Sequence, residues 1–164
     1  MNRNYRLRVV LDTEEDVIRD IVISADEKLS RLHESVVTAF NLYPGEMASF
    51  YRSNGDWEQG AEISLENFGY ASEVELMVDK KIGDMLGAKG DRLIYVYDLL
   101  NLWTFFLEVV ATEETTDASE PLIYKIKGER PEKAPAIMME SINLSDEVDL
   151  PEDDFEQEEY LYED

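Results

Sequence analysis

Two strongly apolar segments, separated by five residues, constrain the fold of this chain more than any other feature. Residues 93–97 read Leu-Ile-Tyr-Val-Tyr, and residues 103–110 read Trp-Thr-Phe-Phe-Leu-Glu-Val-Val. Segments that are apolar on both faces and rich in β-branched and aromatic residues are typical of strands buried inside a layered fold. The short connection suits antiparallel neighbours. We therefore expect the two segments to pair at the centre of a sheet.

The N-terminal region predicts a β-hairpin followed by one main helix. Apolar side chains recur at every second position of residues 5–11, and a polar turn leads into the β-branched residues 17–23. Apolar residues then recur at helical spacing from Leu29 to Phe40, before Pro44 and Gly45 end the pattern. Ser24 or Asp26 is the expected N-cap.

Further strands are expected at residues 47–52, 73–79 and 122–126. In the second of these, Val74, Leu76 and Val78 alternate with carboxylates and are expected to face the core. The fold class is therefore α+β. We expect a β-β-α opening similar to a β-grasp, one main helix, and a mixed or antiparallel sheet of about six to seven strands.

The acidic residues are concentrated at the C-terminal end. The chain has 164 residues, with 38 Asp+Glu against 15 Lys+Arg and a net charge of −23. Residues 145–164 hold 11 of the acids, no Lys or Arg, and several Leu, Phe and Tyr residues. We expect residues 1–144 to form a single α+β domain and residues 145–164 to form a disordered acidic tail.

Charge and residue types argue against several classes of function. A surface this acidic repels phosphate groups, so we expect no direct nucleic-acid binding and no membrane docking. The absence of cysteine excludes disulfides, thiolate nucleophiles and cysteine-bound metals. We find no signal peptide, transmembrane run, phosphate-binding loop or calcium-loop pattern, so a cytoplasmic protein is expected and no cofactor, metal site or catalytic residue is assigned.

His33 is the one histidine of the chain and a candidate binding residue. It lies next to Leu32 on the predicted helix, one position away from the apolar face. Two interpretations stay open. His33 is either a helix-flank residue bonded to a neighbouring carbonyl or carboxylate, or a base or metal ligand with Glu34 or Asp98 as its partner.

The order of these elements and several short segments resemble the plasmid pRi ORF-three-like family, also labelled insertion-element passenger or TnpR-like proteins. The resemblance covers about residues 5–135. A Trp-Arg-Arg-Ile-like strand of the family corresponds to Ile-Arg-Asp-Ile at residues 18–21, and a Leu-His pair to residues 32–33. A His-x-x-x-Phe-like segment corresponds to residues 46–50, and a Gly-x-x-Pro-Pro-Glu-like segment to residues 128–132.

The most characteristic family segment reads Tyr-x-Tyr-Asp-Phe-Gly-Asp-x-Trp-x-His and corresponds to residues 95–105. Tyr95, Tyr97, Asp98 and Trp103 keep their places, whereas the Gly-Asp pair and the histidine are lost. The chain thus resembles a divergent member that has kept mainly the scaffold. Tyr97, Asp98 and Trp103 join His33 as candidate binding residues. No serine-recombinase constellation is present, so the TnpR label does not transfer a resolvase function.

Three functions follow as hypotheses. The first is a non-enzymatic interaction module that engages a basic protein partner through its acidic surface or tail. The second is a metal-dependent enzyme that uses carboxylates. The third is a DNA mimic associated with mobile elements, which occupies the DNA site of a basic protein.

Overall fold

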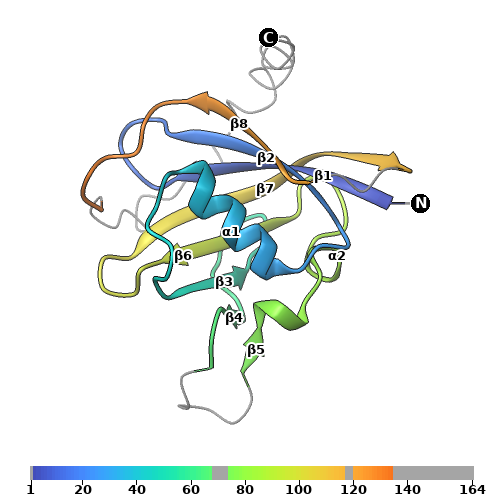
Figure 1. Ribbon diagram of the computed structural model, residues 1–164, viewed down its shortest axis with the longest axis horizontal. Coiled ribbons are helices and arrows are strands. Elements are labelled where there is room, and N and C mark those ends of the chain that lie inside the picture. The colour runs from blue at the N-terminus through green and yellow to red at the C-terminus, as the bar shows by residue number, and fades with distance from the viewer. Residues whose placement is uncertain (1, 68–73, 117–119, 135–164) are drawn as a thin grey trace.

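The computed structural model describes residues 2–67, 74–116 and 120–134, which form one mixed sheet with α1 packed on one face (Figure 1). Its eight strands have the order β5-β4-β3-β6-β7-β1-β2-β8, and each pair is antiparallel except β4 and β5. The strands are β1 (Asn2–Leu11), β2 (Ile18–Ser24), β3 (Ala48–Arg52), β4 (Glu62–Ser64), β5 (Glu75–Leu76), β6 (Arg92–Tyr97), β7 (Trp103–Thr115) and β8 (Leu122–Lys127). The helices are α1 (Leu29–Ala39), the 3-10 turn η1 (Met77–Asp79) and α2 (Ile82–Met85).

The two apolar segments form β6 and β7, and they pair antiparallel at the centre of the sheet as predicted. Tyr95 lies opposite Phe105, and Tyr97 lies opposite Trp103. Phe105 also packs against Phe40 at the end of α1, with ring centroids 4.7 Å apart. The central strands therefore support the helix directly.

The hairpin of β1 and β2 and the helix after it are confirmed in their predicted order, while the likeness to a β-grasp stays a prediction. The predicted N-cap is wrong, because the residue before α1 is Lys28. The Ser24 hydroxyl instead accepts a hydrogen bond from the Asp26 amide at 3.1 Å and closes a turn after β2. The amide of Leu29 donates to the Lys80 carbonyl at 2.9 Å, so a distant segment fixes where the helix begins.

The expectation for residues 73–79 is wrong in detail. Of residues 74–79, which the structure describes, only Glu75 and Leu76 form a strand, and the chain then turns into η1, which buries Met77 fully and leaves Val78 56% exposed. A 3-10 turn has about three residues per turn, so side chains no longer alternate between two faces. The eighth strand is β4, whose three residues are too short to show a periodic pattern in the sequence.

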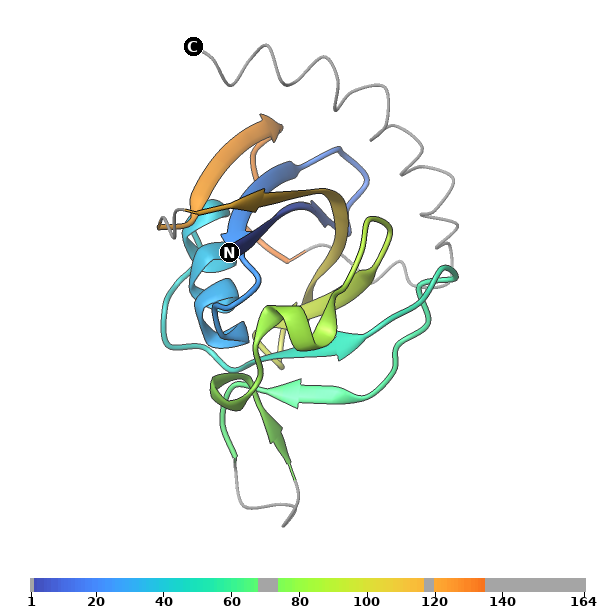
Figure 2. The same ribbon diagram turned by 90° about the vertical axis from the view of Figure 1, so that its right-hand side faces the viewer.

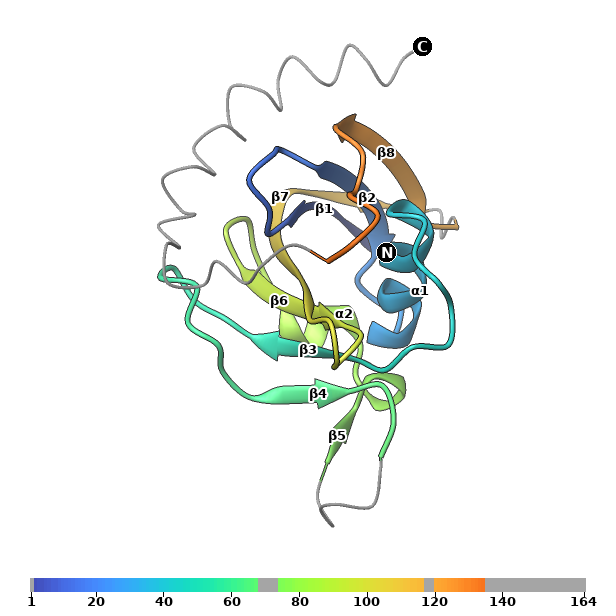
Figure 3. The same ribbon diagram turned by 90° about the vertical axis from the view of Figure 1, so that its left-hand side faces the viewer.

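Most of the core lies between the sheet and α1, which the side views show on one side of the strands (Figure 2, Figure 3). A smaller apolar cluster of Trp57, Ile94, Val96 and Phe106 packs on the opposite face. No helix within the described residues is both long and apolar enough to span a membrane. The proposed tail, residues 145–164, lies outside the described residues.

Candidate binding site

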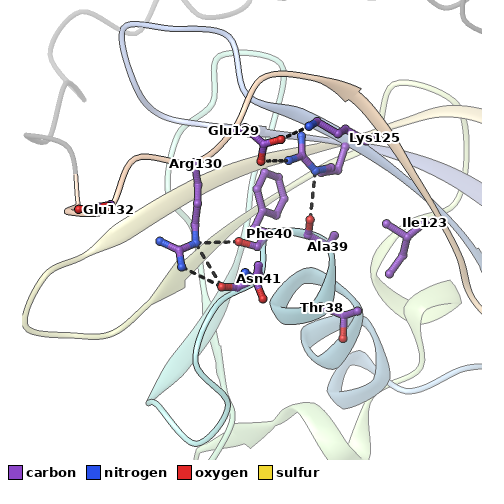
Figure 4. A pocket seen from close by; sticks show the side chains of 10 residues that line it. Thr38, Ala39, Phe40, Asn41, Ile123, Lys125, Glu129, Arg130 and Glu132 are labelled. Carbon is purple, nitrogen blue, oxygen red and sulfur yellow. Dashed lines mark hydrogen bonds and ion pairs between the residues drawn. The ribbon is translucent and has the colours of Figure 1, made fainter.

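A cleft of about 430 Å³ lies where the carboxyl end of α1 meets β2, β8 and the segment after β8 (Figure 4). Arg19, Lys125 and Arg130 bring positive charge to this cleft, and Glu129 and Glu132 bring negative charge. The remaining lining residues are Thr38, Ala39, Phe40, Asn41 and Ile123. The cleft is therefore a small cationic site on a strongly acidic protein.

Arg19 enters the cleft from β2 and is only 5% exposed. Its Nε donates to the Ala39 carbonyl at 3.1 Å, and its Nη1 donates to the carbonyls of Ile18 and Lys127 at 3.0 Å each. Its guanidinium also lies 5.3 Å from the centre of the Phe40 ring. Burial lowers the pKa of Arg19 because it disfavours the charged form.

Arg130 also binds this end of α1, through the carbonyls of Phe40 and Asn41 (Figure 4). Its Nε donates to the Phe40 carbonyl at 2.8 Å, and its Nη2 donates to the Asn41 carbonyl at 2.9 Å. The last carbonyls of a helix lack partners within the helix and carry partial negative charge. Arg19 satisfies the Ala39 carbonyl at the end of α1, and Arg130 satisfies the next two, so the cleft is built around the helix C-terminus.

A carboxylate of the protein itself already lies in this cationic site. Glu129 accepts a hydrogen bond from Lys125 Nζ, and its other oxygen lies 3.7 Å from Arg19 Nη2. The Glu129 side chain is 75% exposed, so it is held mainly by these charges. Figure 4 shows Lys125 and Glu129 together at one end of the cleft.

Tyr97 and Trp103, two of the predicted site residues, are brought together next to this cleft. They face each other across β6 and β7, and the Arg130 guanidinium lies 5.6 Å from the centre of the Trp103 ring. The Tyr97 hydroxyl donates to the Tyr43 carbonyl at 2.5 Å. Its pKa is raised, chiefly by burial. Both aromatic side chains are buried and neither lines the cleft, so they contribute to the core beside it.

Asp98 follows Tyr97 and organises the connection between β6 and β7. Its backbone has a φ of +64°, a conformation that Asp adopts more readily than most residues. Its carboxylate accepts hydrogen bonds from the Leu100 amide at 3.1 Å and from Asn101 Nδ2 at 2.7 Å. The Asn101 side-chain bond is the main reason that the pKa of Asp98 is lowered. Through these hydrogen bonds Asp98 stabilises the turn between β6 and β7.

His33 is separate from the other three predicted residues and has a different partner from those expected. Its Nδ1 lies 2.7 Å from the Tyr95 hydroxyl, and its side chain is buried between α1 and β6. The expected carbonyl or carboxylate partner is therefore wrong, because β6 presents a phenol to this face of the helix. Among the described residues, no three His, Asp or Glu side chains group as metal ligands.

The buried position of His33 predicts a pH dependence of stability. Burial lowers its pKa, outweighing the opposite effect of Glu34. The unfolded chain then binds a proton near the ordinary pKa of about 6.5 before the folded chain does. The free energy of unfolding should therefore fall as the pH is lowered through about 6.5.

Urea unfolding at pH 7.5 and 5.5 tests this expectation. Because the chain has no second histidine, His33→Gln should reduce the difference between the two pH values. An equal difference in the variant would show that His33 is not the responsible group.

The cationic residues of the cleft were not predicted from the sequence. Arg19 and Arg130 fall within two of the segments that carry the family resemblance, residues 18–21 and 128–132. Their position within these segments was the signal in the sequence that could have identified them as site residues. No periodic pattern shows that the two segments converge on the end of one helix.

Comparisons with known proteins agree with this architecture. A crystal structure of a protein of unknown function from Methanosarcina mazei Go1 has a TM-score of 0.62 to this chain at 14% sequence identity, covering 75% of this chain and 68% of the other. That likeness concerns the fold alone. No curated protein matches the sequence. Residues 3–158 match the profile of the family described as Plasmid pRiA4b ORF-3-like protein, and the chain therefore belongs to this family.

Proposed function

We propose that this protein is a non-enzymatic binding module that engages a basic protein partner through its acidic surface. The observation that carries the proposal is that most Lys and Arg side chains are paired with carboxylates of the same chain. At least eleven of the 15 Lys and Arg side chains lie within 4.0 Å of an Asp or Glu of the same chain. The surface that a partner contacts therefore carries the excess of acidic groups.

The hairpin of β3 and β4 is one described region where this excess extends along a continuous element. Residues 46–66 carry five exposed acids and a single cation, Arg52. That cation is itself 3.8 Å from Glu75. The five acids are Glu46, Asp56, Glu58, Glu62 and Glu66. A basic surface facing this hairpin gains complementary charge over one continuous element, and residues 145–164 supply a second acidic segment.

Affinity capture with the full chain and matched charge variants tests the proposal. The hairpin variant combines Glu46→Gln, Asp56→Asn and Glu66→Gln, and the tail variant replaces the 11 acids of residues 145–164 by Asn and Gln. The control removes the same number of exposed charges elsewhere, as Glu14→Gln, Glu15→Gln and Asp79→Asn.

A basic protein captured by the unmodified chain should be released at high salt, because screening weakens exposed charge pairs. The control should retain it, and the hairpin or tail variant should lose it. Equal capture by all four proteins, or a captured partner without a basic surface, would contradict the proposal.

A further inference from the structure

We propose that the cleft at the carboxyl end of α1 is a binding site for a carboxylate ligand that carries an apolar group. This site is distinct from the acidic surface to which the basic partner is assigned. The proposal rests on the hydrogen-bond donors of the cleft, its local charge, its internal carboxylate and its apolar wall.

Hydrogen-bond donors of Arg19 remain available in the cleft. Arg19 uses Nε and Nη1 on backbone carbonyls, and within the described residues its Nη2 meets only the Glu129 carboxylate, at 3.7 Å. That distance is too long for a hydrogen bond. A guanidinium presents five N–H donors, and burying a charged group is costly unless it is paired and hydrogen-bonded. A carboxylate closer to Nη2 would supply the hydrogen bonds that this end of the Arg19 guanidinium lacks.

The local charge of the cleft suits a monoanion. Three cations and two carboxylates line it, which leaves one positive charge. A phosphate brings about 1.5 to 2 negative charges at neutral pH and would be opposed by Glu129 and Glu132. A single carboxylate neutralises the site, and arginine forms matched pairs with the carboxylate plane.

Glu129 acts in this proposal as an internal occupant of the site. It places a carboxylate between Lys125 and Arg19, which shows that this chemical group fits there. Because its side chain is 75% exposed, it can move aside for an incoming carboxylate without opening the core while it stays at the edge of the cleft. Removing the charge of Glu129 should therefore strengthen binding.

The apolar wall defines the rest of the ligand. Ile123 on β8 is 37% exposed, and Ala39 and Phe40 line the cleft from the end of α1. A volume of about 430 Å³ lies within the range of small-molecule sites. A carboxylic acid with an aromatic or aliphatic group of modest size fits both parts of the cleft.

Titration of the full chain with sodium benzoate, followed by ¹H–¹⁵N NMR at constant ionic strength, tests the site. The Nε–H signals of Arg19 and Arg130 report on the cleft directly. Benzamide serves as the uncharged analogue, acetate lacks the apolar group, and inorganic phosphate tests the alternative anion. We expect saturable shifts with benzoate, weaker binding of acetate, and no saturable shift with benzamide or phosphate.

Substitutions separate the cleft from the general charge of the protein. Lys125→Gln should weaken benzoate binding about threefold or more, and Glu129→Gln should strengthen it by a similar factor. Lys127→Gln is the matched control, since Lys127 lies on the same strand but pairs with Asp16 outside the cleft. Unchanged backbone signals elsewhere confirm that each variant is folded. Equal responses to benzoate and benzamide, a stronger response to phosphate, or equal effects of Lys125→Gln and Lys127→Gln would overturn the proposal.

Discussion

Replacing Asp20 by Asn should lower the free energy of unfolding by about 3–5 kcal/mol, because the buried Arg8 and the partly buried Arg6 would lose their shared counter-ion. The Asp20 side chain is fully buried on β2. Its carboxylate accepts hydrogen bonds from Arg6 Nε at 2.7 Å and from Arg8 Nε and Nη2 at 2.9 Å each. The Arg8 side chain is itself 1% exposed, and Arg6 lies over the ring of Tyr124. Asn keeps the shape of Asp20 but supplies no charge.

Urea unfolding of the two proteins at pH 7 measures this loss. Asp26→Asn is the matched control, because Asp26 is 66% exposed and lies 4.0 Å from Lys81, a geometry typical of surface pairs worth about 0–1 kcal/mol. Similar stability losses in the two variants would show that the buried cluster does not hold β1 and β2 together.

Gly128→Ala should destabilise the protein by about 2–4 kcal/mol through backbone strain and a steric clash. Gly128 follows β8 and has a φ of +73°, which side chains other than glycine adopt at a cost. A Cβ at this position would lie 2.1 Å from the Asp16 carbonyl oxygen in the turn before β2. The end of β8 and the segment carrying Glu129 and Arg130 would have to move, so the cleft should be disturbed as well.

Gly90→Ala separates the cost of backbone strain from the cost of the steric clash. Gly90 has a φ of +98°, but nothing lies within 4 Å of a Cβ placed there. It should therefore cost only about 1–2 kcal/mol of backbone strain. Thermal or urea unfolding of both variants measures the difference, and equal losses would mean that the contact with Asp16 is relieved without cost.

The central strand pair and the main helix could be predicted because their signals are local. The apolar run from Leu93 to Tyr97 and the one beginning at Trp103 are long enough for burial to decide their structure. The start of α1 could not be predicted, because the bond from Leu29 to the Lys80 carbonyl joins segments far apart in the chain. The short strand β4 likewise depends on pairing with β3.

The sequence by itself determined the sheet-rich α+β class, the order of hairpin and helix, and the strongly negative net charge. These properties follow from side-chain periodicity and composition, which folding does not alter. Only the tertiary structure decided that Arg19 and Arg130 meet at the end of α1 and that His33 bonds to Tyr95. Such contacts join residues distant in sequence, and strand order and register determine them. Neither strand order nor register is encoded in a local pattern.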